Sequence, residues 1–254
     1  MRLHLHEWGD PGAPTLVCLH GIMAHGERYR RLAEDRLAHR FHVVAPDLRG
    51  HGRSGYEPPW SLEQHIDDLL ESVPEDAQLW VGHSFGGRIV LELAHRRPER
   101  IERGILLDPP LWVPPGYALG RAEETRGDRS FATVEEAVEE RLAGGTVFGA
   151  PRELVEEDYR AHLERGEDGR LRTRFSRSAV IAAWGEMART PPQERLTVPL
   201  LVVRAVQAEV CPPPLLEAYR ETVGPLLEAT DVPGGHIVMW DALAETADAI
   251  ESFL

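Results

Sequence analysis

The sequence predicts an α/β fold built on a mostly parallel, doubly wound sheet of about seven or eight strands. Short apolar runs that end at Gly, Pro or Asp alternate with longer segments of helical periodicity, as in parallel βα units. The chain has 254 residues, of which 42% are hydrophobic, so it can bury a substantial core. One long segment interrupts the alternation, which indicates an insertion between two strands.

The predicted strands are short, apolar and bounded by turn residues, and they span 3–8, 15–20, 42–46, 78–81, 101–107, 199–204 and 227–232. The predicted helices carry apolar residues three and four positions apart and span 27–39, 61–72, 86–96, 213–223 and 242–254. Ser61 followed by Gln64 has the pattern of a capping box, which marks the start of a helix.

The insertion, residues 112–192, is bracketed by proline pairs and shows no strand pattern. Helical spacing predicts two amphipathic helices, one around 134–142 and one after Pro151. A third helix around 178–188 is apolar on more than one side, so it must bury two faces or line a pocket with one. We therefore expect a core formed by 1–111 and 193–254 and an inserted helical segment formed by 112–192.

Charge and composition exclude several classes of partner. With 42 acidic and 28 basic residues, the chain has a net charge of −14 and no basic run. It therefore lacks the electrostatic footprint of a nucleic-acid binder, and anionic membrane surfaces would repel it. The two cysteines are far apart in the sequence and no apolar run approaches the ~20 residues that span a bilayer. These features predict a cytoplasmic protein that acts on a small molecule; they say nothing about its oligomeric state.

The stretch from Gly82 to Gly87 carries the strongest chemical signal. It follows a predicted strand, precedes a predicted helix and contains Ser84 in a G-x-S-x-G pattern. In such an elbow the serine occupies a strained turn, and glycines are needed because side chains there would collide with backbone. The helix start offers N–H groups to a developing oxyanion. We therefore expect Ser84 to be a nucleophile.

A serine nucleophile needs a base. His236 follows Gly234 and Gly235 in the loop after the last predicted strand, where two glycines allow an imidazole to reach back over the sheet edge. None of the other eleven of the 12 histidines has both this position and this hinge, so His236 is the expected base.

With these motifs the chain resembles the α/β hydrolases over nearly its whole length. His20-Gly21 is similar to the oxyanion motif of that family, and the run 47–54 is similar to its D-x-R-G-x-G-x-S turn, which is mainly structural. The resemblance implies that the backbone N–H groups of Ile22 and Phe85 form an oxyanion hole and that 112–192 is a cap over the site.

The acid of the triad has two candidates. The family usually carries it after its seventh strand, where 204–212 aligns without a gap and puts Glu209 in place of the usual aspartate. Some family members instead carry it after the sixth strand, where this chain has Asp108. The expected triad is Ser84, His236 and Glu209, with Asp108 as the rival for the third position.

The expected reaction is hydrolysis of a carboxylic ester with an uncharged, small to medium acyl group. It needs water but no cofactor, and no metal site is expected, because His4 and His6 share a strand face without a neighbouring ligand set. The same residues would serve a C–C bond hydrolase, a thioesterase, a lactonase or a perhydrolase, and a non-catalytic ligand receptor is the alternative of another class. Apolar residues expected in the pocket walls are Ile22, Met23, Phe85, Trp184, Met187, Ile237 and Val238.

Overall fold

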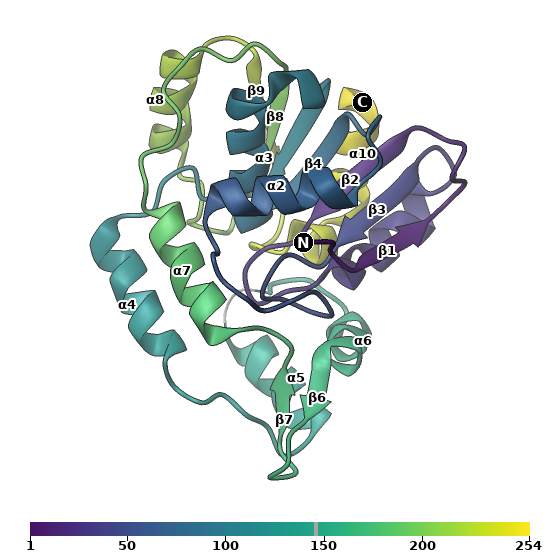
Figure 1. Ribbon diagram of the computed structural model, residues 1–254, viewed down its shortest axis with the longest axis vertical. Coiled ribbons are helices and arrows are strands. Elements are labelled where there is room, and N and C mark those ends of the chain that lie inside the picture. Colours follow the sequence, from purple (N-terminus) through teal and green to yellow (C-terminus); the bar gives the residue numbers. More distant parts are fainter. Residues whose placement is uncertain (145–146) are drawn as a thin grey trace.

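A seven-stranded sheet forms the centre of the computed structural model, which describes residues 1–144 and 147–254 (Figure 1). Its strand order is β1-β3-β2-β4-β5-β8-β9, and only the edge strand β1 is antiparallel to its neighbour. The strands are β1 (Leu5–Trp8), β2 (Thr15–Leu19), β3 (His42–Pro46), β4 (Leu79–His83), β5 (Arg103–Leu107), β8 (Leu200–Ala205) and β9 (Leu227–Val232). The fold class expected from the sequence is confirmed, and each strand lies where a strand is predicted.

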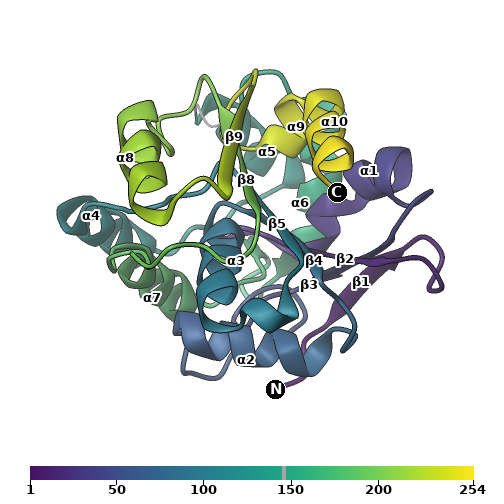
Figure 2. The same ribbon diagram turned by 90° about the horizontal axis from the view of Figure 1, so that it is seen from above.

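The sheet has a hydrophobic core on each face, as the near-continuous apolar strands require. Along β2, Val17 and Leu19 pack into one core and Leu16 and Cys18 into the other, because successive side chains point to opposite faces. Figure 2 shows the layers from above: three helices cover one face, and the other is covered by the helical turns after β2 and by the C-terminal helices. The first set is α2 (Leu62–Ser72), α3 (Phe85–Arg96) and α8 (Pro213–Val223), and the C-terminal pair is α9 (Val238–Asp241) and α10 (Leu243–Phe253).

The helix predicted at 27–39 is not a single α-helix. The chain forms a 3-10 turn, η1 (Gly26–Tyr29), a short α-turn, α1 (Arg30–Leu32), and a wider π-turn, η2 (Ala33–Leu37). The π-turn closes where the Ala38 N–H donates to the Ala33 carbonyl five residues back, at 2.8 Å. The apolar periodicity alone does not reveal this widening.

Between β5 and β8 the chain forms two helix pairs and a hairpin (Figure 1). Helix α4 (Pro115–Thr125) packs against α7 (Arg177–Met187), and α5 (Val134–Ala143) packs against α6 (Arg152–His162). The expectation of no strands in this segment is wrong, because β6 (Leu163–Arg165) and β7 (Leu171–Thr173) pair antiparallel. Strands of three residues are too short to show alternation. Helix α4 also has no counterpart among the predicted helices.

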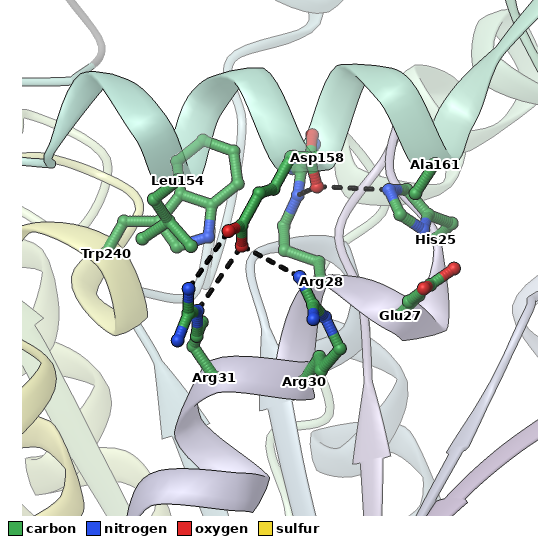
Figure 3. A pocket seen from close by; sticks show the side chains of 10 residues that line it. His25, Glu27, Arg28, Arg30, Arg31, Leu154, Asp158, Ala161 and Trp240 are labelled. Atoms are coloured by element: carbon green, nitrogen blue, oxygen red, sulfur yellow. Dashed lines mark hydrogen bonds and ion pairs between the residues drawn. The ribbon is translucent and has the colours of Figure 1, made fainter.

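Ion pairs attach α6 to the first helical turns of the core, as Figure 3 shows from close by. Asp158 accepts hydrogen bonds from Arg28 at 2.8 and 3.0 Å and from His25 Nε2 at 3.0 Å. Glu157, the residue before Asp158 on α6, pairs with Arg30 and Arg31 in a more exposed position.

A second attachment uses Arg88 of α3. Its buried guanidinium donates to the carbonyls of Leu111 at 2.9 Å and Thr190 at 3.3 Å, and it pairs with Glu92. One side chain therefore holds both ends of the 112–192 segment against the helix that follows Ser84. In the described part of the chain, the helices are too short or too polar to cross a membrane.

Candidate active site

A cavity of about 900 Å³ lies at the carboxyl ends of the parallel strands, where α/β sheets place their ligands. Core residues that line it include Ser84 after β4, Gln207 to Val210 after β8, and His236 after β9. All four helices of the 112–192 segment contribute to the opposite walls. The cavity therefore lies between the core and the inserted segment, and residues far apart in the sequence meet there.

Ser84 occupies the strained turn that the motif predicts. Its backbone has φ 54° and ψ −119°, and its N–H donates to the Leu107 carbonyl of the neighbouring strand at 2.9 Å. A Cβ on Gly82 would lie 2.2 Å from the Gly86 carbonyl oxygen, and one on Gly86 would lie 2.3 Å from that of Leu19. The glycines are therefore required by close backbone approach, and the tight turn places Ser84 at the cavity surface.

His236 is oriented by a carboxylate. Its Nδ1 donates to Asp108 Oδ2 at 2.6 Å, so the other ring nitrogen, Nε2, is left with a free lone pair. Asp108 is fully buried directly after β5, and its other oxygen, Oδ1, accepts from the Ala205 N–H at 3.2 Å. A buried carboxylate held on one side by backbone and on the other by an imidazole fixes the tautomer and the direction of the ring.

The expectation that Glu209 orients His236 is wrong. Glu209 lies exposed on the rim of the cavity, in the loop after β8, and makes no hydrogen bond with the described residues. That loop turns outward early, because the Ala208 N–H bonds back to Ala205 and the Gln207 N–H bonds to Gly234. Asp108 takes the position instead, at the end of the strand that lies beside β4 in the sheet.

The comparisons with known proteins agree with this architecture. A family model described as the alpha/beta hydrolase fold matches residues 14–243. The chain belongs to the α/β-hydrolase family.

Two curated relatives align with this hydrolase over nearly their whole length. Lipase LipV of Mycobacterium tuberculosis is 30% identical over 99% of this chain and 97% of its own. The 3-hydroxybutyrate-oligomer hydrolase of Cupriavidus necator is 29% identical over 99% of this chain and 92% of its own. Among solved structures, E-2-(acetamidomethylene)succinate hydrolase superposes with a TM-score of 0.81 at 24% identity, over 99% of this chain and 94% of that one, which shows the shared fold.

In this α/β hydrolase, the backbone groups expected to bind an oxyanion lie beside Ser84. A Cβ added to Gly21 would lie 2.9 Å from Ser84 Cβ, so the backbone that leads into Ile22 packs directly against the serine. Phe85 is the first residue of α3. Within the described residues, the N–H groups of Ile22 and Phe85 donate to no backbone or side-chain acceptor.

Two buried histidines hold the loop that carries Ile22. His20 Nδ1 donates to the Gly21 carbonyl at 2.7 Å, and His20 Nε2 accepts from the Leu48 N–H at 2.9 Å. His51 Nε2 accepts from the Met23 N–H at 3.3 Å. Burial lowers the pKa of both imidazoles, that of His51 to about 4, which keeps them neutral and able to accept. The 47–54 run thus supports the site, as its structural role in the family implies.

Most expected pocket residues of the hydrolase line the cavity, namely Ile22, Met23, Trp184, Met187 and Ile237. The expectation is wrong for two others. Val238 begins α9 and is fully buried in the core between the sheet and the C-terminal helices, so it does not line the cavity. The Phe85 side chain is also fully buried and packs against His65, so Phe85 can offer only its backbone.

Sequence reasoning missed other residues at the site. The His83 ring lies 4.7 Å from that of His236, and its Nε2 donates to the His236 carbonyl at 2.7 Å, which positions the loop that carries His236. His83 occupies the first x position of the G-x-S-x-G motif, where any residue is allowed, so the motif does not indicate a role for it. Arg28, Arg141 and His162 also line the cavity, although they lie on segments with no chemical motif.

Two further groups bear on alternative chemistries. Burial raises the pKa of the Cys211 thiol to about 12, so it is not a thiolate at neutral pH. His4, His6 and Asp47 bring three possible metal-ligand atoms within 4.8 Å of one another, which corrects the view that no carboxylate lies near the histidines. Asp47, however, already accepts from Gly26 N–H at 2.7 Å, Arg53 N–H at 2.8 Å and His6 Nε2 at 3.2 Å. These bonds explain Asp47 as a support for the loops.

Proposed function

We propose that this protein is a serine esterase whose triad is Ser84, His236 and Asp108. The single observation that supports it best is the strained Ser84 in the same cavity as an imidazole already oriented by a buried aspartate. The names lipase and hydrolase carried by the two full-length relatives support hydrolysis as the class of reaction.

The proposed reaction proceeds through an acyl-enzyme. Ser84 Oγ attacks the ester carbonyl carbon while its proton passes to His236 Nε2, and the Asp108 carboxylate stabilises the imidazolium that forms. The N–H groups of Ile22 and Phe85 donate to the oxyanion. The alcohol leaves with the proton from His236, a water then attacks the acyl-enzyme by the same route, and the carboxylic acid is released.

We infer that residues 112–192 act as a cap that excludes water and selects the substrate. Tyr117, Trp184 and Met187 supply apolar surface on the α4 and α7 side of the cavity, which suits an apolar chain of small to medium length. The same triad can cleave thioesters, lactones or C–C bonds or carry out perhydrolysis, so the ester is the first substrate class to test.

Turnover of a p-nitrophenyl acyl series from acetate to octanoate tests this function. We expect Ser84-dependent hydrolysis, with kcat reduced at least about 10⁴-fold in Ser84→Ala and in His236→Ala. A fluorophosphonate should label the wild-type chain and not Ser84→Ala. Labelling that persists in Ser84→Ala contradicts the proposed nucleophile, and ligand binding without turnover of any acyl compound favours a receptor instead.

A further inference from the structure

The two sides of the cavity differ in chemistry. Helices α4 and α7 present mainly aromatic and aliphatic side chains, whereas α5 and α6 present Arg141, Asp158, Tyr159 and His162, beside Arg28 from η1. Figure 1 shows that the two helix pairs occupy different parts of the inserted segment. An uncharged ester accounts for the first wall. It does not account for the second, which we call the polar wall: Arg28, Arg141, Asp158, Tyr159 and His162.

Arg141 is the residue of the polar wall that lacks an anion. Four arginines line the cavity, and three of them are paired: Arg28 with Asp158, Arg121 with Glu124 and Arg129 with Glu140. Arg141 is only partly exposed, and its guanidinium forms no hydrogen bond or ion pair with any residue that the structure describes. Burial lowers its pKa, but a guanidinium stays protonated in proteins. A partly buried cation without a counter-ion is costly unless a ligand supplies one.

His162 gives a second, independent indication of a ligand. The residue is 2% exposed and lines the cavity, and neither ring nitrogen has a hydrogen-bond partner among the described residues. Its ring stacks on that of His25 with centroids 4.3 Å apart, so its orientation is fixed. Burial lowers the pKa of His162, so the neutral ring offers one N–H donor and one acceptor. Buried polar atoms are nearly always satisfied, which points to a polar ligand group here.

We propose that Arg141 and His162 form a subsite for a carboxylate of the substrate, so that the compound hydrolysed at Ser84 is an ester that also carries a free carboxylate. The inference rests on the proposed function. It replaces the uncharged acyl group expected from the sequence with a molecule that is apolar along the α4 and α7 wall and anionic at the polar wall.

The charge balance favours a carboxylate over a phosphate. Asp158 neutralises Arg28, and the pairs formed by Arg121 and Arg129 are also neutral, so Arg141 carries the one unpaired positive charge of the polar wall. The unpaired carboxylate that lines the cavity, Glu209, is exposed on the rim after β8 and not on α5 or α6. A monoanion matches the charge of Arg141, and a planar guanidinium can bind both carboxylate oxygens. Arg28 and Arg141 also contribute, after burial and His236, to the low pKa of His83, the residue before Ser84.

Matched acid esters and neutral esters test the subsite. The first set compares monomethyl with dimethyl succinate, glutarate, adipate and suberate, which places the carboxylate in the acyl part. The second compares 4-acetoxybutanoate with its methyl ester, which places it in the alcohol part. Hydrolysis is followed by pH-stat titration. We expect kcat/KM of the wild type to favour the acid ester in at least one pair.

Arg141→Gln should lower kcat/KM for the preferred acid ester about 10- to 100-fold, as expected for losing a hydrogen bond to a charged group, and change that of its neutral partner less than about threefold. Arg141→Lys should retain part of the preference. Arg129→Gln is the matched control, because it removes the same charge from the same cavity but from a guanidinium already paired with Glu140. It should leave the ratio of acid to neutral ester within about threefold.

A preference for the neutral ester in every pair, or equal losses for both esters in Arg141→Gln, overturns the inference while leaving the esterase function intact. Binding is measured separately by thermal shift of Ser84→Ala with the acid ester. We expect stabilisation that is absent in Ser84→Ala/Arg141→Gln. Such stabilisation without Ser84-dependent turnover of any ester would contradict the proposed function and leave the subsite standing.

Discussion

At the scale of single residues, backbone strain is concentrated around the cavity. Three non-glycine residues among those described have a left-handed φ: Met23 at 58°, Ser84 at 54° and Asp108 at 42°. Each such residue costs about 1–3 kcal/mol, which the surrounding structure must offset. In our proposal, Met23 follows the oxyanion-hole residue Ile22, and the other two carry triad side chains. The strain thus coincides with the residues whose direction matters most.

The two candidate acids should respond very differently to neutralisation. Asp108→Asn removes the acceptor of the His236 Nδ1–H bond and favours the wrong tautomer, so we expect kcat to fall about 10³- to 10⁴-fold. Glu209→Gln changes an exposed side chain that is unpaired in the described structure, and it should alter kcat less than about threefold.

Steady-state hydrolysis of a p-nitrophenyl ester by both variants measures the difference. Circular dichroism of Asp108→Asn serves as the control for folding, because the residue is fully buried. A large loss in Glu209→Gln together with a small one in Asp108→Asn would reverse our assignment of the acid.

Residue roles were predictable where the signal was local in the chain. Ser84 and His236 each lie within a short glycine-containing motif, so the neighbouring residues in the sequence identify them. The choice between Asp108 and Glu209 depended on whether the loop after β8 turns outward, which is set by its bonds to Ala205 and Gly234. The unpaired state of Arg141 depends on the folding of three other segments, so no local pattern could reveal it.

At the scale of elements, the elbow between β4 and α3 depends on glycine because of backbone packing. Gly86→Ala would place Cβ 2.3 Å from the Leu19 carbonyl oxygen of β2. The backbone of a central strand can move away from this contact only at a large cost in free energy. We expect a loss of about 1–3 kcal/mol in the free energy of unfolding, together with a loss of activity.

Gly185→Ala in α7 is the matched control, since a Cβ there meets nothing within 4 Å. This variant should be neutral or up to about 1 kcal/mol more stable, because alanine favours a helix interior. Chemical denaturation of both variants measures the contrast, and equal destabilisation would contradict the packing argument.

The ion pairs of α6 predict a defined pH dependence. Burial acts to raise the pKa of Asp158, but Arg28 and His25 outweigh it and hold the pKa well below its usual 3.8. A depressed folded-state pKa means that the stability gained is complete above the unfolded value and is lost as the pH falls through the folded one. Asp158→Asn should therefore cost about 3–5 kcal/mol at neutral pH.

That cost should stay constant from pH 8 to about pH 5 and shrink below the unfolded pKa of 3.8. Glu157→Gln on the same helix is the control: Glu157, Arg30 and Arg31 are each a third or more exposed, so we expect less than about 1 kcal/mol. Thermal unfolding across this pH range tests both variants. A constant difference down to pH 2 would exclude ionised Asp158 as the cause.

Element boundaries followed most closely from sequence where a proline or glycine borders the element, as Pro46, Pro233 and Gly224 do. The strands β3 and β9 and the helix α8 begin and end at the predicted residues. The hairpin of β6 and β7 was missed because three residues cannot display a period of two. The 3-10 and π turns that follow Gly26 were missed because their departure from a regular α-helix arises from packing and not from the apolar periodicity. At Gly26, for example, a Cβ would lie 2.2 Å from the Ala45 carbonyl oxygen.

At the scale of the whole molecule, Arg88 joins the sheet domain to both ends of the 112–192 segment. Arg88→Met would leave Leu111 and Thr190 without this donor and remove one partner of the buried Glu92. We expect a loss of about 3–5 kcal/mol and faster proteolysis within 112–192. Arg97→Met, directly after the same helix, breaks only the ion pair of two exposed side chains, Arg97 and Glu99, and should change stability less than about 1 kcal/mol. Limited proteolysis that cuts both variants at the wild-type rate would contradict this role.

The Arg88 contacts also bear on how such a protein can change its substrate. The guanidinium binds backbone carbonyls, and these are present whatever side chains the segment carries. Sequences between the two attachment points can therefore diverge, or be exchanged between relatives, without loss of this joint. A foreign insert could be grafted between Leu111 and Thr190 while Ser84, with its strained backbone, and His236 stay unchanged. Substrate specificity could then be exchanged as a separate part of the protein.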